Sequence, residues 1–247
     1  MSFDPFFLLI SETLVVALMI IIMHSVIRQY GIGPLFIFLG AIQFFQTILA
    51  SSVYNIFFES LIFSPGSTVL FSSTLFSIFL VFHSESIKKT RSLIYGLVFS
   101  NIIITVLSYI SLEQAIVDKN SQNLIFLQNI FNFDISLFLT GTSLLYIDSM
   151  LLVILYELLN YKIKGYLFIK IFIVTSVVNL FDSVVFYSLN FYTHENFYDL
   201  LLGNIFGKQI TVLFFSIIIY IYLNIIYKKE RVTRPKNLRE AFKIFSF

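Results

Sequence analysis

The stretch "VVNLFDSVVFYS", residues 177–188, places an aspartate, Asp182, inside a run of apolar and aromatic residues. An ionised carboxylate is costly in such surroundings unless another group stabilises it. The apolar run around Asp182 extends over residues 166–190, and a helix needs about 20 apolar residues to span a bilayer. The stretch therefore predicts a membrane-spanning helix with an acidic residue in its interior.

The composition of the whole chain extends this prediction. Of 247 residues, 58% are apolar and 12% are charged, whereas about 25% of the residues of a soluble domain are charged. We predict an all-α integral membrane protein, a bundle of seven transmembrane helices within residues 1–227 followed by a basic cytoplasmic tail, 228–247. The predicted spans are approximately 5–25, 35–59, 66–83, 92–113, 136–160, 166–190 and 205–227.

Lysine and arginine orient the predicted bundle. If the N-terminus lies outside, 13 of the 16 basic residues fall on the inner side, seven of them in the tail. Positive residues favour the cytoplasmic side, so we predict an N-out, C-in, multi-pass protein of the cytoplasmic (inner) membrane. The tail is expected to contact anionic lipid. Its segment "NLREAFKIF", 237–245, is also compatible with an amphipathic helix on the membrane or on a partner.

Sequence motifs for catalysis are missing. The chain has no cysteine, its histidines His24, His83 and His194 are far apart, and it contains neither an HExxH motif nor a phosphate-binding loop. We therefore expect no enzyme activity, cofactor, metal or nucleic-acid partner, although two intramembrane aspartates leave a protease as an alternative. His24 is expected at the inner membrane interface.

A polar stripe surrounds Asp182. Asn179, Asp182, Ser183 and Phe186 recur at three- and four-residue spacing, so they share one face of the predicted helix. Lipid cannot satisfy such a face, so it must contact protein or water. Asp182 is therefore expected to point into the bundle.

Similar polar residues occur on other predicted helices, notably Asp148, Gln43 and Gln46. An aspartate at mid-membrane costs about 2.5–3.5 kcal/mol, which packing polarity from asparagine or serine would avoid. We therefore predict that Asp148 and Asp182 belong to a solute or proton site. The two glutamines could serve either that site or helix packing, and for Asn101 packing is favoured.

Lys208 is predicted to open the seventh helix, in "LLGNIFGKQITVLFF", 201–215, and to pair with Asp182. The alternative is a lysine that extends to the outer interface. Before the third helix, in "FSPGSTVLF", 63–71, Ser64 is expected to cap the helix with Pro65 at its first position. This connection could form a gate or a tight turn.

The stretches "SPGSTVLFSSTLFSIFLV" (64–81), "FDSVVFYSLNF" (181–191) and "GKQITVLFF" (207–215) resemble the VUT family of vitamin-uptake and queuosine-precursor transporters. The resemblance places Asp182, Ser183, Phe186 and Lys208 on family positions in the late helices. It implies a purine-like or vitamin-like substrate. The family's proline and acidic residue after the first motif are missing here.

A second likeness covers "YGIGPLFIFLGAIQFFQTILASSVY" (30–54), "IYGLVFSN" (94–101) and "NLREAFKIF" (237–245). These segments are similar to membrane domains that precede output modules in some bacterial signalling proteins. The likeness implies a sensing role for the chain.

Together these features predict a transporter for a small solute, such as a queuosine precursor or a vitamin-like heterocycle, held in a polar cavity within the bilayer. A carboxylate can accept the paired N–H donors of a guanine-like edge, and aromatic residues can stack on the ring. The predicted substrate-binding residues are Asp182, Asp148, Lys208, Gln43, Gln46, Asn179, Ser183 and Phe186. The alternative is a membrane-embedded sensor that signals through its tail; the partner would be an ATPase for transport or a signalling protein for sensing.

Overall fold

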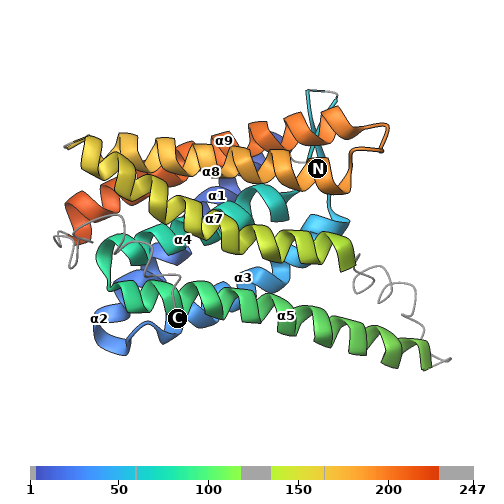
Figure 1. Cartoon of the computed structure of the whole chain (residues 1–247), viewed down its shortest axis with the longest axis horizontal. Helices are drawn as coiled ribbons and strands as arrows, with labels where there is room; N and C mark the ends of the chain where they lie inside the picture. Colours follow the sequence, from blue (N-terminus) through green and yellow to red (C-terminus); the bar gives the residue numbers. More distant parts are fainter. Residues whose placement is uncertain (1–3, 59, 118–134, 164, 228–247) are drawn as a thin grey trace.

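The computed structural model describes residues 4–58, 60–117, 135–163 and 165–227 (Figure 1). The predicted tail, 228–247, lies outside these residues. Within them, seven helices are long and apolar enough to cross a membrane, which confirms the predicted all-α polytopic bundle. The helices are α1 (Pro5–Ser25), α2 (Ile27–Tyr30), α3 (Gly33–Ser52), α4 (Phe71–Ser84), α5 (Ile87–Val117), α7 (Ile135–Lys162), α8 (Leu167–Asn190) and α9 (Phe197–Ile221). Two π-helical segments, η1 (Gly66–Leu70) and η2 (Tyr222–Tyr227), directly precede α4 and follow α9, and two short strands, β1 (Asn55–Phe57) and β2 (Leu61–Phe63), lie between α3 and η1.

Helix α4 forms the centre of the bundle. Almost all of its residues are buried, because the other helices contact it on several sides. Figure 1 shows α8 and α9 packed together along one side of the molecule and α5 along the other, with α4 and α7 between them.

The second predicted span, 35–59, is wrong at its C-terminal end. Helix α3 ends at Ser52, and Val53 already has an extended backbone. Residues after it form an antiparallel hairpin in which Ile56 pairs with Ile62. Aromatic and β-branched residues favour this strand conformation, and the rings of Phe57 and Phe63 stack 3.9 Å apart.

The seventh predicted span is also corrected. Helix α9 begins at Phe197 instead of residue 205, so Lys208 lies well inside the helix and does not open it. Helix α5, Ile87–Val117, extends beyond the predicted 92–113 at both ends. Apolar composition locates the membrane-spanning window, whereas backbone hydrogen bonding continues the helix into polar residues.

The connection before α4 is a tightly packed turn. Ser64 does not cap the helix as predicted, because its hydroxyl donates a 2.7 Å hydrogen bond to the carbonyl of Leu49 in α3. Gly66 packs directly on α3, and a Cβ atom at Gly66 would lie 2.5 Å from the backbone of Gln46 and of Ala50. The start of η1 is therefore held against the C-terminal half of α3.

The hairpin is held against α9 in a similar way. A Cβ atom at Gly203 would lie 2.2 Å from the carbonyl oxygen of Ile62, so only glycine allows this approach. One turn later, a Cβ atom at Gly207 would lie 2.9 Å from the Thr68 side chain. These contacts place the hairpin and η1 beside the part of α9 that carries Lys208.

Candidate ligand cavity

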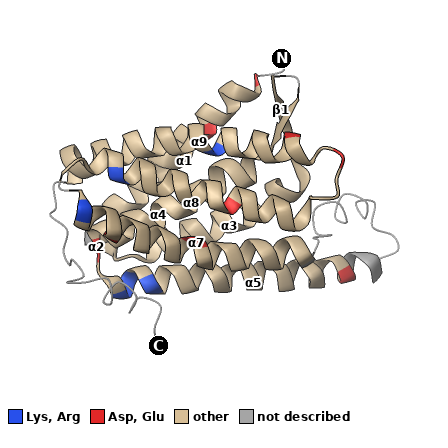
Figure 2. Cartoon of the chain, turned by 45° about the horizontal axis from the view of Figure 1, so that its top comes forward, with Lys and Arg blue, Asp and Glu red and all other residues tan. Residues whose placement is uncertain are grey.

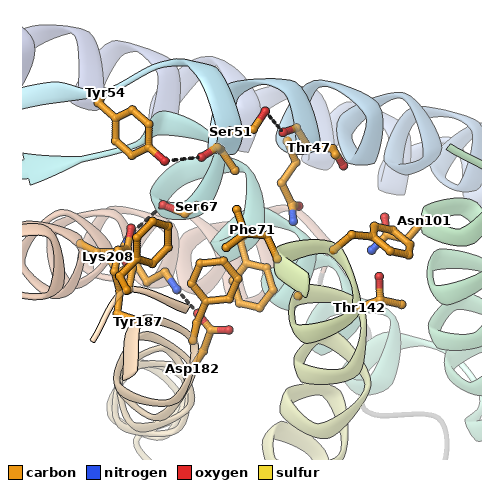
Figure 3. Close-up of a pocket in the computed structure, with 18 residues that line it drawn as sticks. Thr47, Ser51, Tyr54, Ser67, Phe71, Asn101, Thr142, Asp182, Tyr187 and Lys208 are labelled. Carbon is orange, nitrogen blue, oxygen red and sulfur yellow. Dashed lines mark hydrogen bonds and ion pairs between the residues drawn. The ribbon is translucent and has the colours of Figure 1, made fainter. Parts of the chain in front are cut away.

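A cavity lies among α3, η1, α4, α5, α7, α8 and α9, and it contains about 870 Å³ of space that protein atoms do not fill, including space open to the surroundings (Figure 3). The lining combines aromatic rings, amides, hydroxyls and one ion pair. It consists of Gln46, Thr47, Ala50, Ser51, Tyr54, Ser67, Phe71, Asn101, Leu137, Phe138, Gly141, Thr142, Asp182, Phe186, Tyr187, Phe191, Asn204 and Lys208.

Asp182 and Lys208 form an ion pair in the wall of this cavity. Lys208 Nζ donates a hydrogen bond to Asp182 Oδ2, and the two residues are 1% and 6% exposed. The ammonium group also stands 4.7 Å from the ring centre of Phe71, which adds a cation–π contact. The predicted pairing is confirmed. The alternative, a lysine reaching the outer interface, is excluded because the side chain is buried.

Gln46 lines the cavity, whereas Gln43 lies behind it. Gln43 Nε2 donates hydrogen bonds to Gln46 Oε1 (3.3 Å) and to Thr74 Oγ1 (2.9 Å). The two amides recur one turn apart on α3, so one can hold the other. Gln43 is not part of the cavity lining, but its hydrogen bond holds the side chain of Gln46, which is.

Asn179 and Ser183 also lie behind the lining. Asn179 Oδ1 accepts a hydrogen bond from Ser72 Oγ at 2.9 Å, and Ser183 Oγ lies 2.8 Å from Asn204 Oδ1. Asn204 in turn donates to Ser67 Oγ at 2.6 Å, and both residues line the cavity. The two predicted residues of α8 thus support the wall.

Asp148 is fully buried and does not line the cavity. Neither of its carboxylate oxygens has a hydrogen-bond donor among the described residues. It is close enough to Asp182 and Lys208 for electrostatic interaction with both. Of the residues Gln43, Asp148 and Asp182, which were expected around one space, only Asp182 borders it.

Aromatic side chains supply the apolar part of the lining. Phe186, which was predicted from the polar stripe of α8, contacts the rings of Tyr187 at 5.5 Å and Phe191 at 6.2 Å. Phe71 stands beside the ion pair (Figure 3). Flat ring surfaces of this kind can stack on a planar solute.

Several lining residues were not predicted from the sequence. Asn204 lies one turn before Lys208, so the spacing of four residues could have placed it on the same face of α9. Asn101 was assigned to helix packing, yet it lines the cavity. Thr142 and Tyr187 had no distinguishing pattern, because single hydroxyls are common in membrane helices.

Side chains pack closely between the cavity and the end of the bundle that contains Ser84, the last residue of α4. Phe76 of α4 stacks on Phe215 of α9 with ring centres 4.9 Å apart. Farther along, His24 Nε2 lies 2.7 Å from Ser84 Oγ, and Nδ1 lies 2.8 Å from Tyr222 Oη. His24 lies in the last turn of α1, where it is buried and both ring nitrogens are bonded within the protein.

The helices and the cavity define a multi-pass membrane protein with a polar and aromatic site between its helices. The chain belongs to the vitamin uptake-like sensor (VUPS) family, whose family model matches residues 16–223. This agrees with the resemblance to vitamin-uptake proteins at the level of the family. Comparisons with curated proteins and with solved structures found no match.

Proposed function

We propose that the chain is a membrane-embedded sensor that binds a small, flat heterocycle in this cavity. The observation that carries the proposal is the Asp182–Lys208 pair in the cavity wall. Charged residues at such depth are costly and usually mark solute sites. The pair offers a cationic donor and a carboxylate acceptor at one place, next to aromatic rings.

A guanine-like ring, as in a queuosine precursor, fits this chemistry. Lys208 contacts Oδ2 of Asp182, and the Asp182 side chain lines the cavity, where its carboxylate could accept an N–H donor of the ring. Phe71 and Phe186 supply surfaces for stacking, and Gln46 presents an amide from α3. The same residues would also suit a vitamin-like heterocycle with similar donors.

Two observations favour sensing over transport. The family is described as sensors, and the bundle is packed between the cavity and the end that holds His24, Ser84 and Tyr222. A signal would then pass to a signalling protein on the cytoplasmic side of the inner membrane. Transport is the second candidate, favoured by a polar cavity that lies between the helices long enough to cross a membrane. It would require a gradient or a partner ATPase. Neither role requires catalysis by the chain.

The test uses guanine as the probe with the purified full chain in lipid nanodiscs. Asp182→Asn keeps the shape of the side chain but removes its charge, so guanine affinity should fall at least about tenfold, the loss expected for a charge-assisted hydrogen bond. The matched control is Asp199→Asn, an acidic residue in the first turn of α9 that does not line the cavity. Unchanged affinity in Asp182→Asn would refute the site.

A second measurement separates the two roles. Proteoliposomes containing the chain should accumulate radiolabelled guanine no faster than protein-free vesicles if the chain is a sensor. Uptake that depends on Asp182 would instead establish transport and reject sensing as the sole function.

A further inference from the structure

A second buried acid, Asp148 of α7, lies beside the ion pair. It is fully buried, and its carboxyl group interacts with that of Asp182 as a hydrogen bond between side chains. The packing of α7 against α8 gives the same placement. Thr140 Oγ1 of α7 donates to Asn190 Oδ1 of α8 at 3.4 Å. Because the two helices run antiparallel, eight residues forward on α7 and eight back on α8 bring the two aspartates to one level.

The contact between the two acids places a condition on their charge. Two ionised carboxylates cannot hydrogen-bond to each other, because each is only an acceptor. No other donor reaches either carboxyl oxygen of Asp148 in the part of the chain that the structure describes. A buried hydroxyl without a partner stays neutral, whereas an ionised carboxylate without one leaves a charge in the interior, which is far more costly. Asp148 therefore differs from the unpaired hydroxyls of the bundle.

The charges around Asp148 lead to the same condition. The charged groups that act on it are Asp182 and Lys208. Two ionised acids beside one ammonium group would leave one negative charge unbalanced in the interior, which is strongly unfavourable. One bound proton makes the cluster neutral.

Other titratable side chains on the helices that pack against α7 do not supply this balance. His83 Nδ1 of α4 lies 2.9 Å from Tyr156 Oη, and Tyr156 is eight residues, or about 12 Å, beyond Asp148 along α7. Lys170 of α8 donates to Asn160 Oδ1 at 2.8 Å, near the C-terminal end of α7. Further titratable groups on these helices include Tyr146 and Glu157 on α7, Arg91 and Tyr95 on α5, and Tyr187 on α8. None of these is among the groups that act on Asp148.

We propose that Asp148 and Asp182 form a buried proton-binding site, in which Asp148 holds the proton and donates a hydrogen bond to Asp182. Lys208 contacts Asp182 directly and keeps that acid ionised. An ionised acid beside Asp148 opposes the ionisation of Asp148, because like charges repel at short range. The proton is taken from water, and no other bond forms or breaks.

This inference deepens the proposed function, on which it rests for the ligand, since it sets the charge that the ligand meets in the cavity wall. Asp182 borders the cavity, whereas Asp148 does not. With the proton bound, the two acids and Lys208 are together neutral. An uncharged ring such as guanine can then enter without changing the charge of the interior. A cationic ring would keep that balance only by displacing the proton of Asp148.

The pH dependence of unfolding tests the site in the purified full chain without ligand. Asp148→Asn keeps the size of the side chain and a hydrogen-bond donor toward Asp182, but it has no proton to release. The matched control is Asp199→Asn in the first turn of α9, which lies outside the cavity lining. Above about pH 5 an ordinary aspartate has lost its proton, so unfolding would release the proton that Asp148 holds in the folded chain.

The direction of the effect follows from this release. A folded chain that binds one more proton than the unfolded chain becomes less stable as the pH rises. Between about pH 5 and pH 7, the unfolding constant of the wild-type chain should therefore increase about tenfold per pH unit relative to that of Asp148→Asn. Asp199→Asn should have the wild-type dependence. Equal dependence in the wild-type chain and Asp148→Asn would overturn the site.

Infrared spectroscopy of the folded chain provides a second measurement. At neutral pH the wild-type chain and Asp199→Asn should show the C=O stretching band of a protonated carboxyl group, and this band should be weaker or missing in Asp148→Asn. No band in the wild-type chain, or an equally strong band in Asp148→Asn, would overturn the site. Both measurements omit the ligand. Failure of the chain to bind guanine would therefore refute the proposed ligand alone, and these data would still decide the proton site.

Discussion

Asp182 is stabilised within the membrane by Lys208, which answers the question raised by the acidic residue in its apolar stretch. The two groups are buried together and contact each other directly. A buried ion pair contributes little net stability, because desolvation of both charges offsets their attraction. Stability alone therefore does not explain the pair in the cavity wall, which supports the proposed ligand site.

This view predicts different effects for the two partners. Lys208→Met should destabilise the chain by about 3–5 kcal/mol, because it leaves a buried carboxylate unpaired. Asp182→Asn should be milder, and the double variant should be more stable than Lys208→Met alone. Unfolding in detergent measures all three. If Lys208→Met and the double variant are equally unstable, the lysine contributes through packing and the charge argument is wrong.

At the residue scale, the sequence predicted which faces of the helices carry polar residues. It did not predict which of those residues border the cavity and which lie behind its lining. Asp182, Lys208, Gln46 and Phe186 line the cavity, while Gln43, Asp148, Asn179 and Ser183 lie one layer behind. Helical periodicity fixes the direction of a side chain. Its distance from the cavity depends on how neighbouring helices approach, and single-helix patterns do not contain that information.

At the level of elements, the hairpin is the main departure from the predicted fold. Residues 55–63 are as apolar as a membrane helix, so hydropathy alone assigned part of them to the second span. The available signal was the pair of short apolar runs, Ile56–Phe58 and Leu61–Phe63, separated by two polar residues. On α9, Gly203 contacts the hairpin and Gly207 contacts η1. The role of these two glycines could not be interpreted without knowing which residues pack against them.

The Gly203 contact can be tested by adding one methyl group. Gly203→Ala should destabilise the chain by about 1–3 kcal/mol or more, because the new Cβ atom overlaps the backbone of Ile62 and a strand cannot move aside easily. Guanine affinity should also fall, because the next residue, Asn204, lines the cavity.

Gly96→Ala is the matched control for this change. Gly96 lies within α5, and a Cβ atom there would meet nothing within 4 Å. Alanine should therefore be neutral or stabilise the helix by up to about 1 kcal/mol. Equal stability of the two variants in a denaturation series would show that the hairpin is not anchored at Gly203.

At the scale of the whole molecule, the basic residues and the cavity lie in opposite halves of the bundle. Figure 2 shows basic residues near α2 and the start of α5, at one end of the bundle. The cavity instead involves the C-terminal end of α3, the N-terminal part of α7 and the C-terminal half of α8. The lining thus lies in the half of the bundle opposite the basic end. If the cavity binds a solute as proposed, the orientation of the chain determines from which compartment that solute enters.

Cysteine labelling tests that orientation, because the chain has no cysteine of its own. Thr193 is exposed in the turn between α8 and α9, and Tyr161 is 89% exposed near the opposite end, close to the C-terminus of α7. Basic residues favour the cytoplasmic side, so Thr193→Cys should react with a membrane-impermeant maleimide in intact cells. Tyr161→Cys should react only after permeabilisation. The reverse pattern would place the basic end outside and the cavity in the cytoplasmic half. The chain would then detect solute from inside the cell.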